Sequence, residues 1–90
     1  MKKIYKSTQY KKDFKRYKNQ PKKLKKLFDI LDLLENDKPI PADNSPHTLK
    51  GKYQDFWECH IEGDFLLIWI DEENNSIELV RLGSHSELFD

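Results

Sequence analysis

The segment from residue 64 to residue 70, Asp-Phe-Leu-Leu-Ile-Trp-Ile, limits the possible folds more than any other part of the chain. Successive side chains of a strand point to opposite faces, so this run places apolar side chains on both faces of a sheet. Such a strand is stable where both faces are covered. The sequence therefore predicts a sheet with residues 64–70 as its central, covered strand.

Two segments with a period of two lie near this strand and predict antiparallel neighbours. Residues 53–61 form the first and residues 76–82 the second. Glu62-Gly63 is expected as a two-residue hairpin turn, and a second turn is expected around Glu73-Asn74. The side chains expected on one face of the first strand are Tyr53, Trp57, Cys59 and Ile61, while Gln54, Phe56, Glu58 and His60 share the other.

The first third of the chain has the period of helices instead. Residues 3–6 predict a short strand, after which Ser7 or Thr8 can cap a helix. A second, antiparallel helix is expected to begin at Pro21, because proline suits the first turn. The apolar stripes are Tyr10, Phe14 and Tyr17 in the first helix and Leu24, Leu27, Phe28, Leu31 and Leu34 in the second.

A proline-containing loop over residues 36–45 and a capped helical turn over residues 84–89 complete the predicted elements. Their order is β-α-α-β-β-β. This order predicts an α+β fold in which a two-helix antiparallel hairpin packs on an antiparallel sheet, with a short C-terminal helical turn.

The length and composition narrow the class of protein. Ninety residues are too few for two separate cores, so residues 1–90 are expected to form one domain. No segment approaches the roughly 20 apolar residues of a membrane span, and the N-terminus lacks a signal-peptide core. The single cysteine, Cys59, excludes an internal disulfide and suits a reducing compartment. We expect a soluble, cytoplasmic protein that has no membrane partner.

The net charge of zero conceals a strong asymmetry. Residues 1–26 contain twelve Lys or Arg and one acid, a net charge of +11, whereas residues 27–90 carry a net charge of −11. A basic N-terminal third suits a polyanion such as RNA. The same lysines also serve simply to solvate two helices, and charge alone does not separate these interpretations.

The register of the predicted hairpins brings polar residues from distant segments together. With the expected turns, His60 faces Phe65 and Arg81 faces Leu66, so the last strand returns toward Glu62-Gly63. A one-residue slip would change which faces the side chains occupy but not the end of the sheet at which they lie. The residues expected to gather there are His60, Asp64, Arg81 and His85.

This set of residues suits metal-free cleavage of a phosphodiester. Histidine, with a pKa of about 6.5, can take a proton from a 2′-hydroxyl or give one to the departing 5′-oxygen. Asp64 can orient a histidine, and Arg81 can bind the phosphate in a bidentate way. A lone histidine is more often structural, so the cluster is a hypothesis at this stage.

Other sites have weaker support. Cys59 and His60 are adjacent in a strand and point to opposite faces, so a zinc site is not expected, and no metal or other cofactor is predicted. Cys59 is expected in the core and not as a nucleophile. The aromatic residues of the strands are also expected in the core, which reserves base stacking for Phe89, near the histidines.

Three motifs resemble those of the YafQ-type messenger-RNA interferases of the RelE superfamily. They are Pro46-His47-Thr48-Leu49-Lys50-Gly51, then the segment from Cys59 to Trp69, and then Arg81-Leu82-Gly83-Ser84-His85-Ser86-Glu87-Leu88-Phe89. The resemblance extends over nearly the whole chain and includes the basic helical hairpin. It implies a RelE-like fold, ribosome-dependent cleavage of mRNA in the A site, and inhibition by a cognate antitoxin.

The resemblance also implies roles for particular residues. The family's functional positions match His47, His60, Asp64, His85 and Phe89, with His85 as the principal acid or base. Arg81 falls in the phosphate-binding region, and we add Lys50 and Lys52 as phosphate-binding candidates. Phe65 departs from the family, which can carry Trp after the aspartate, so base stacking or codon preference is expected to differ.

Two rival functions share the predicted fold. A gyrase-directed toxin of the ParE type is not expected to need the histidines. An inactive relative would bind RNA or antitoxin through the basic hairpin without cleaving. The resemblance favours an active toxin that is a monomer when free and a heteromer with its antitoxin.

Overall fold

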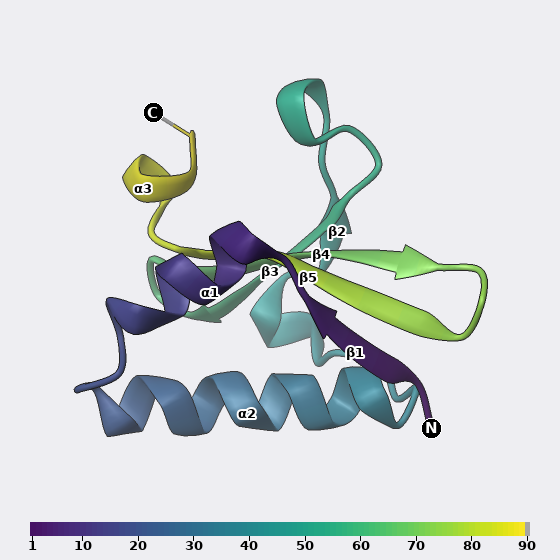
Figure 1. Cartoon of the computed structure of the whole chain (residues 1–90), viewed down its shortest axis with the longest axis horizontal. Helices are drawn as coiled ribbons and strands as arrows, with labels where there is room; N and C mark the ends of the chain where they lie inside the picture. The colour runs from purple at the N-terminus through teal and green to yellow at the C-terminus, as the bar shows by residue number, and fades with distance from the viewer. Residues whose placement is uncertain (90) are drawn as a thin grey trace.

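The computed structural model describes residues 1–89, which form a five-stranded sheet with helices on either side (Figure 1). The helices and strands are β1 (Lys3–Lys6), α1 (Thr8–Lys15), α2 (Pro21–Glu35), β2 (His47–Thr48), β3 (Trp57–Glu62), β4 (Phe65–Glu72), β5 (Ser76–Gly83) and α3 (His85–Phe89). Two 3₁₀ turns, η1 (Ala42–Asn44) and η2 (Gly51–Tyr53), flank β2. The predicted α+β order is confirmed, with β2 and the 3₁₀ turns as additions.

The strand order is β1-β5-β4-β3-β2, which places β4 at the centre of the sheet as predicted. Leu66, Leu67 and Ile68 of this strand have no exposed surface. The prediction of an entirely antiparallel sheet is wrong, because β1 pairs with β5 in parallel, from Lys3 beside Ser76 onward. A four-residue edge strand contains too little pattern to reveal its direction.

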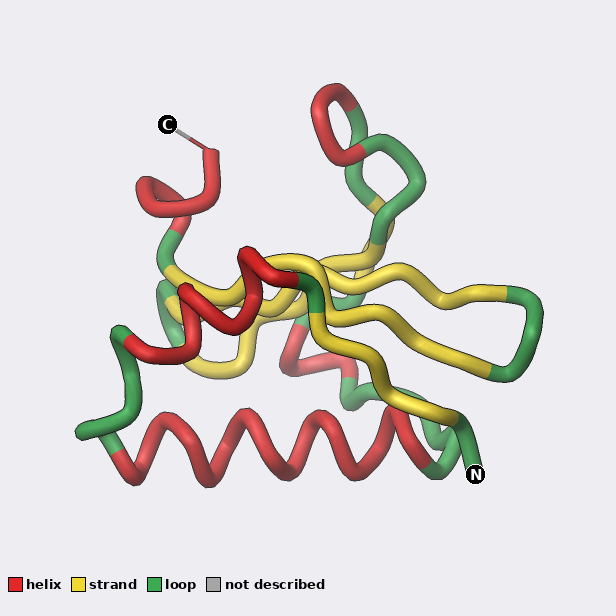
Figure 2. The backbone as a smooth tube through the Cα atoms, in the orientation of Figure 1, coloured by secondary structure: helices red, strands yellow, loops and turns green. Residues whose placement is uncertain are grey.

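The first helix begins where the sequence predicts. Ser7 caps it, and the Ser7 Oγ accepts a hydrogen bond from the backbone N–H of Tyr10 at 2.9 Å. The helix ends at Lys15, so Tyr17 lies in the turn that follows, yet its side chain is still buried. A short turn then leads into α2, which runs below the sheet in the view of Figure 2.

The buried face of α2 differs from the predicted one. Leu27, Ile30 and Leu34 are buried, whereas Phe28 is 51% exposed. Ile30 lies three residues after Leu27, so both point toward the sheet, and Phe28 is turned about 100° away. Phe28 packs instead near Phe14 of α1, with ring centroids 6.4 Å apart.

The β3–β4 turn is displaced by one residue from the prediction. Gly63 and Asp64 form it, and Gly63 adopts a left-handed conformation with φ of 48°. His60 consequently pairs with Leu66 and not with Phe65, and a bulge follows His60. The predicted register was therefore wrong, although His60 still lies near the turn.

The β4–β5 register was also wrong. The turn covers residues 73–75, so Glu72 pairs with Ser76, and a bulge interrupts the pairing between Ile68 and Trp69. Gly83 consequently pairs with Leu66, and Arg81 with Ile68. The end of β5 still returns toward the β3–β4 turn, which is the feature on which the predicted cluster depends.

Tyr53 occupies a different position from the predicted one. The strand expected over 53–61 begins only at Trp57, and Tyr53 belongs to η2. Its side chain joins Leu66, Ile68 and Leu88 in a buried cluster on the opposite face from Cys59. The 3₁₀ turn breaks the period-two pattern, so the face of Tyr53 does not follow from counting residues.

The two faces of the sheet have different coverings. The larger core lies between the sheet and the N-terminal helices and includes Leu27, Leu34, Cys59, Leu67, Trp69 and Leu79. The smaller cluster, around Tyr53 and Leu88, lies on the opposite face, from which α3 and η2 project (Figure 2). Among the described residues, no helix is long and apolar enough to cross a membrane.

Candidate active site

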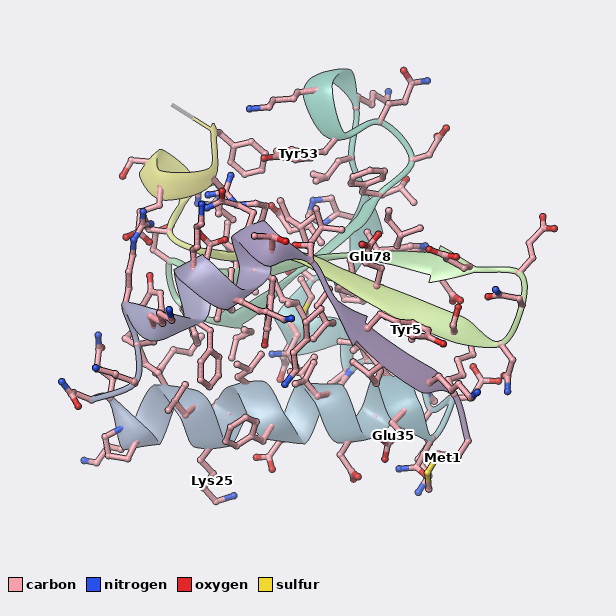
Figure 3. The ribbon with its side chains drawn as sticks, viewed as in Figure 1. Met1, Tyr5, Lys25, Glu35, Tyr53 and Glu78 are labelled. Carbon is pink, nitrogen blue, oxygen red and sulfur yellow. The ribbon has the colours of Figure 1, made fainter. Side chains whose placement is uncertain are left out.

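The candidate site lies on the sheet face opposite α2, between α3 and the η2 loop. Figure 3 shows Tyr53 between these two segments. Tyr53 is buried, and its ring meets that of Phe89 edge to face at 5.8 Å. The aromatic pair therefore connects the η2 loop to α3.

Asp64 and His85 form the best-defined contact in the site. The Asp64 Oδ1 accepts the backbone N–H of His85 at 2.9 Å and lies 2.8 Å from the ring Nδ1. An ionised carboxylate only accepts, so Nδ1 carries the proton and Nε2 is free to accept one. The backbone N–H first, and then the ring of His85, hold the pKa of Asp64 below its usual value.

His60 lies beside His85, with ring centroids 5.7 Å apart. The His60 Nδ1 lies 3.2 Å from the carbonyl oxygen of Gly63, which again assigns the proton to Nδ1 and leaves Nε2 free. The structure thus brings His60, Asp64 and His85 together from the end of β3, the β3–β4 turn and α3. Two free imidazole nitrogens in one site suit a reaction that needs both a base and an acid.

His47, in β2, contacts the buried acid Glu58 of the neighbouring strand β3. Its Nδ1 lies 2.7 Å from the carbonyl oxygen of Ser45, and its Nε2 lies 3.2 Å from Glu58 Oε1. Only the imidazolium form donates to both oxygens. Glu58 is 3% exposed, and its Oε2 has no hydrogen-bond partner among the described residues.

Glu58 was not assigned a role by the sequence analysis. It shares a strand face with His60, and an acid at such a position is a signal of function, because carboxylates are rarely buried without a partner. Glu58, His60 and His85 each offer one donor atom, and these atoms lie within 4.8 Å of one another. The three residues therefore form a carboxylate and two imidazoles around one small volume.

Arg81 contacts Tyr53 and Glu87, but most N–H groups of its guanidinium already donate to protein acceptors. The Nε and Nη2 contact the carboxylate of Asp13 at 2.8 and 3.3 Å. Nη1 donates to the Tyr53 hydroxyl, and Nη2 also donates to the carbonyl oxygen of Glu87. Of five guanidinium N–H groups, four have protein acceptors, so the predicted bidentate binding of a phosphate conflicts with these contacts, because one N–H group remains.

The remaining predicted residues lie around the opening. Phe89 is 44% exposed, and its ring lies 5.9 Å from that of His85, which suits a base-stacking role. Lys50 and Lys52 are exposed on the η2 loop, across from α3. The Lys52 ammonium lies over the Tyr53 ring at 5.4 Å from its centroid, so it can move toward a phosphate without losing a buried contact.

Asp13 and Tyr53 are the other residues that the sequence analysis missed. Asp13 is the single acid beside twelve basic residues in the first 26, which is the one sequence signal for it, and the structure buries it completely. Burial alone would raise the pKa of Asp13, but hydrogen bonds from Arg81, the Leu82 backbone and Gln9 outweigh it and lower the pKa. No sequence signal distinguishes Tyr53 from the other aromatic residues.

Comparison with known proteins gives matches over nearly the whole chain. Residues 2–90 match the family described as the bacterial toxin of type II toxin–antitoxin system, YafQ. The mRNA interferase toxin YafQ of Escherichia coli K12 is 33% identical over 84 residues, which cover 92% of this chain and 90% of that protein.

Solved structures give the same result for the fold. The crystal structure of a metal-bound toxin from Helicobacter pylori has a TM-score of 0.88 and 39% identity, with 99% of this chain and all of that chain covered. The crystal structure of the E. coli DinJ–YafQ complex has a TM-score of 0.86 and 30% identity, with complete coverage of both chains. This chain therefore belongs to the YafQ family of bacterial toxins of type II toxin–antitoxin systems.

Proposed function

We propose that this toxin is an endoribonuclease that cleaves messenger RNA in the ribosomal A site and so stops translation in the cytoplasm. The observation that carries the proposal is the convergence of His60, Asp64 and His85, with the two imidazole rings 5.7 Å apart. The mRNA interferase activity named for the E. coli relative supports the same reaction class.

The reaction requires two proton transfers. The 2′-oxygen attacks phosphorus as a base removes its proton, and the bond from phosphorus to the 5′-oxygen breaks as an acid protonates the leaving oxygen. The products are a 2′,3′-cyclic phosphate and a 5′-hydroxyl. His60 and His85 each present a free Nε2, so one imidazole accepts the first proton and the other, as imidazolium, supplies the second.

Asp64 and Glu58 prepare the histidines for these roles. Asp64 fixes the tautomer of His85 and stabilises its protonated form. Glu58 Oε1 lies 3.2 Å from His47 Nε2, and the Glu58 carboxylate also lies near both His60 and His85. Both protons are therefore accepted and donated by side chains of the protein itself.

The phosphate and bases of the RNA are held from the two sides of the opening. Lys50 and Lys52 supply exposed positive charge from the η2 loop, and Phe89 offers a ring face for stacking. Arg81 binds Asp13 through its Nε. It contributes positive charge to the site through its one remaining N–H group. This role replaces the bidentate one expected from the sequence.

The partners follow from charge and from the relatives. The E. coli relative is found in a complex with the antitoxin DinJ, which supports a cognate antitoxin for this chain. The net charge of +11 over residues 1–26 suits ribosomal RNA, which we propose binds along the basic helices α1 and α2. The free toxin is proposed to be a monomer.

The metal-bound state of the H. pylori relative suggests a second property of the site. Glu58 Oε2 is buried without a partner, and the donor set of one carboxylate and two imidazoles suits a divalent transition metal. We propose that Glu58, His60 and His85 hold such an ion. A bound metal would occupy imidazole nitrogens needed for proton transfer, so it would inhibit cleavage and not promote it.

Primer extension on a reporter mRNA after brief induction tests the cleavage proposal, with wild type, His85→Ala and the control Ser86→Ala in parallel. Discrete in-frame cuts are expected with wild type and Ser86→Ala but not with His85→Ala. A reconstituted assay with and without ribosomes tests the dependence on the A site. Growth arrest with intact mRNA and DNA damage would overturn the proposal and indicate a gyrase-directed toxin.

A further inference from the structure

The helix that carries His85 and Phe89 is too short to be stable by itself. α3 has five residues, and isolated helices of this length do not persist in water. Leu88 provides one buried side chain, but His85 and Phe89 are exposed on the same helix. The position of His85 over Asp64 must therefore be fixed by contacts made elsewhere on α3.

Glu87 makes the contacts that fix the start of the helix. Its Oε1 accepts the backbone N–H of Ser84 at 2.8 Å, and its own backbone N–H donates to Ser84 Oγ at 3.2 Å. These reciprocal bonds form a capping box, which satisfies two free donors of the first turn. Glu87 thus fixes Ser84 as the N-cap, so that α3 begins at His85.

The same carboxylate joins α3 to the N-terminal part of the chain. Oε1 accepts a hydrogen bond from the Tyr17 hydroxyl at 2.6 Å, and Oε2 lies 3.4 Å from Arg16 Nη1. The Tyr17 ring is in turn held against Phe65 at 4.6 Å between centroids. Tyr17 is anchored in the larger core, so its hydroxyl is a fixed point to which the carboxylate is tied.

Gly83 makes this arrangement possible. A Cβ at this position would lie 2.6 Å from Glu87 Oε1 and 3.4 Å from Glu87 Cβ, and the φ of 153° is one that other residues rarely adopt. The glycine at the end of β5 therefore allows the carboxylate to approach the backbone. Arg81, held by Asp13, adds a contact to the Glu87 carbonyl oxygen on the other side of the helix.

We propose that Glu87 is a positioning residue, which ties α3 to Tyr17 and thereby sets His85 against Asp64 for RNA cleavage. The proposal rests on the proposed function for its catalytic consequence, although the positioning itself can be measured without activity. Glu87 acts through His85 and needs no contact with RNA. Its carboxylate serves three groups at once, namely the capped backbone, the Tyr17 hydroxyl and the Arg16 guanidinium.

The test compares Glu87→Ala, Glu87→Gln and Tyr17→Phe with the controls Glu73→Gln and Tyr5→Phe, which change exposed residues outside the site. Tyr17→Phe removes only the hydroxyl and keeps the ring against Phe65. Glu87→Gln keeps an oxygen that accepts the same hydrogen bonds. Cleavage rates are measured under saturating RNA, and hydrogen exchange of the His85 backbone amide, which donates to Asp64, is followed by NMR.

Glu87→Ala and Tyr17→Phe are expected to lower kcat about tenfold to a hundredfold with little change in KM, because a small displacement of a catalytic group is enough. Glu87→Gln should recover most of the loss. In the folded Glu87→Ala protein, the backbone amide of His85 should exchange with solvent faster, because its hydrogen bond to Asp64 weakens.

Gly83→Ala provides a second variant that keeps Glu87 itself, since its Cβ displaces the Glu87 carboxylate and its φ of 153° adds backbone strain at the end of β5. It should reproduce both effects of Glu87→Ala. Unchanged exchange of the His85 amide and unchanged kcat in folded Glu87→Ala and Tyr17→Phe proteins would overturn the proposal. An inactive wild type whose His85 amide exchange still responds to Glu87→Ala would refute the proposed function and leave the positioning role supported.

Discussion

Asp64 receives two hydrogen bonds from one residue, His85, through its backbone N–H at 2.9 Å and its ring Nδ1 at 2.8 Å. The first bond fixes the start of α3 beside the β3–β4 turn. The second fixes the orientation and tautomer of the imidazole. The Asp64 carboxylate in the hairpin turn therefore fixes the tautomer of the proposed acid or base, and it shares with Glu87 the placement of α3.

Replacement of Asp64 by asparagine tests this relationship. The amide oxygen still accepts one bond, but the charge that stabilises the imidazolium is lost. We expect kcat to fall at least about tenfold, within the range that general acid–base catalysis supplies. Asp64 is exposed, so the thermal midpoint should change little. Full activity in Asp64→Asn, with Asp43→Asn as the exposed control, would contradict the assigned role.

The Asp13–Arg81 pair is expected to be important for stability. Asp13 has no exposed surface, the Arg81 side chain is 14% exposed, and the Nε to Oδ2 distance is 2.8 Å. Asp13 also accepts the backbone N–H of Leu82, which lies beyond the part of β5 that pairs with β1. Asp13→Ala should lower the free energy of unfolding by about 3–5 kcal/mol, because it leaves the largely buried Arg81 guanidinium without its carboxylate partner.

Urea denaturation of Asp13→Ala beside Asp29→Ala measures this difference. Asp29 pairs with Lys25 at 3.5 Å on the exposed face of α2. Exposed pairs of this kind contribute about 0.5 kcal/mol or less. Equal effects of the two substitutions would mean that the Asp13 carboxylate is not required by the fold.

Stability should also depend on acid pH. The pKa values of Asp13, Asp64 and Glu87 are all lowered in the folded protein. For Glu87 the largest cause is the hydrogen bond from Tyr17. Because each folded pKa lies below the unfolded one, the contribution to stability is complete above about pH 5 and is lost as the pH falls through the folded values.

Thermal unfolding from about pH 7 to about pH 3 is expected to show a falling midpoint only in the lower part of this range. Glu87→Gln should reduce the slope there, since it removes one of the three carboxylates. Tyr17→Phe should reduce it less. A midpoint that is constant down to about pH 3 would contradict the lowered pKa values.

The sequence predicted the elements that depend on local patterns. The apolar run of β4, the proline at the start of α2 and the serine before α1 each act over a few residues, and each prediction was confirmed. Both hairpin registers were wrong, yet His60, Asp64 and His85 still meet. Chain direction alone brings the end of β3, the start of β4 and the end of β5 to the same end of the sheet.

The residues that sequence reasoning missed depend on tertiary packing. Asp13 finds Arg81 across 68 positions, and nothing in either segment indicates the pairing. The direction of β1 and the sheet face on which Tyr53 packs depend on which segments lie beside them in the folded chain. Glu58 was placed on the correct strand face, but its burial beside His47 required the path of β2.

The last prediction concerns metal binding by Glu58, His60 and His85. Isothermal titration of the toxin with Zn²⁺ or Cu²⁺ should show one bound ion, with Cu²⁺ the tighter of the two for nitrogen and oxygen donors. The same ions should inhibit cleavage, and a chelator should restore it. Inhibition is expected because metal coordination and proton transfer require the same imidazole nitrogens.

Glu58→Gln provides the sharpest comparison, with Glu62→Gln on the same strand as its control. Glu62 forms an ion pair with Lys26 at 3.3 Å and does not belong to the donor set. Loss of the Glu58 charge should weaken metal binding about tenfold or more, whereas Glu62→Gln should bind as wild type does. Equal affinity in the two variants would place the ion elsewhere on the protein, and the shared-nitrogen explanation of inhibition would then fail.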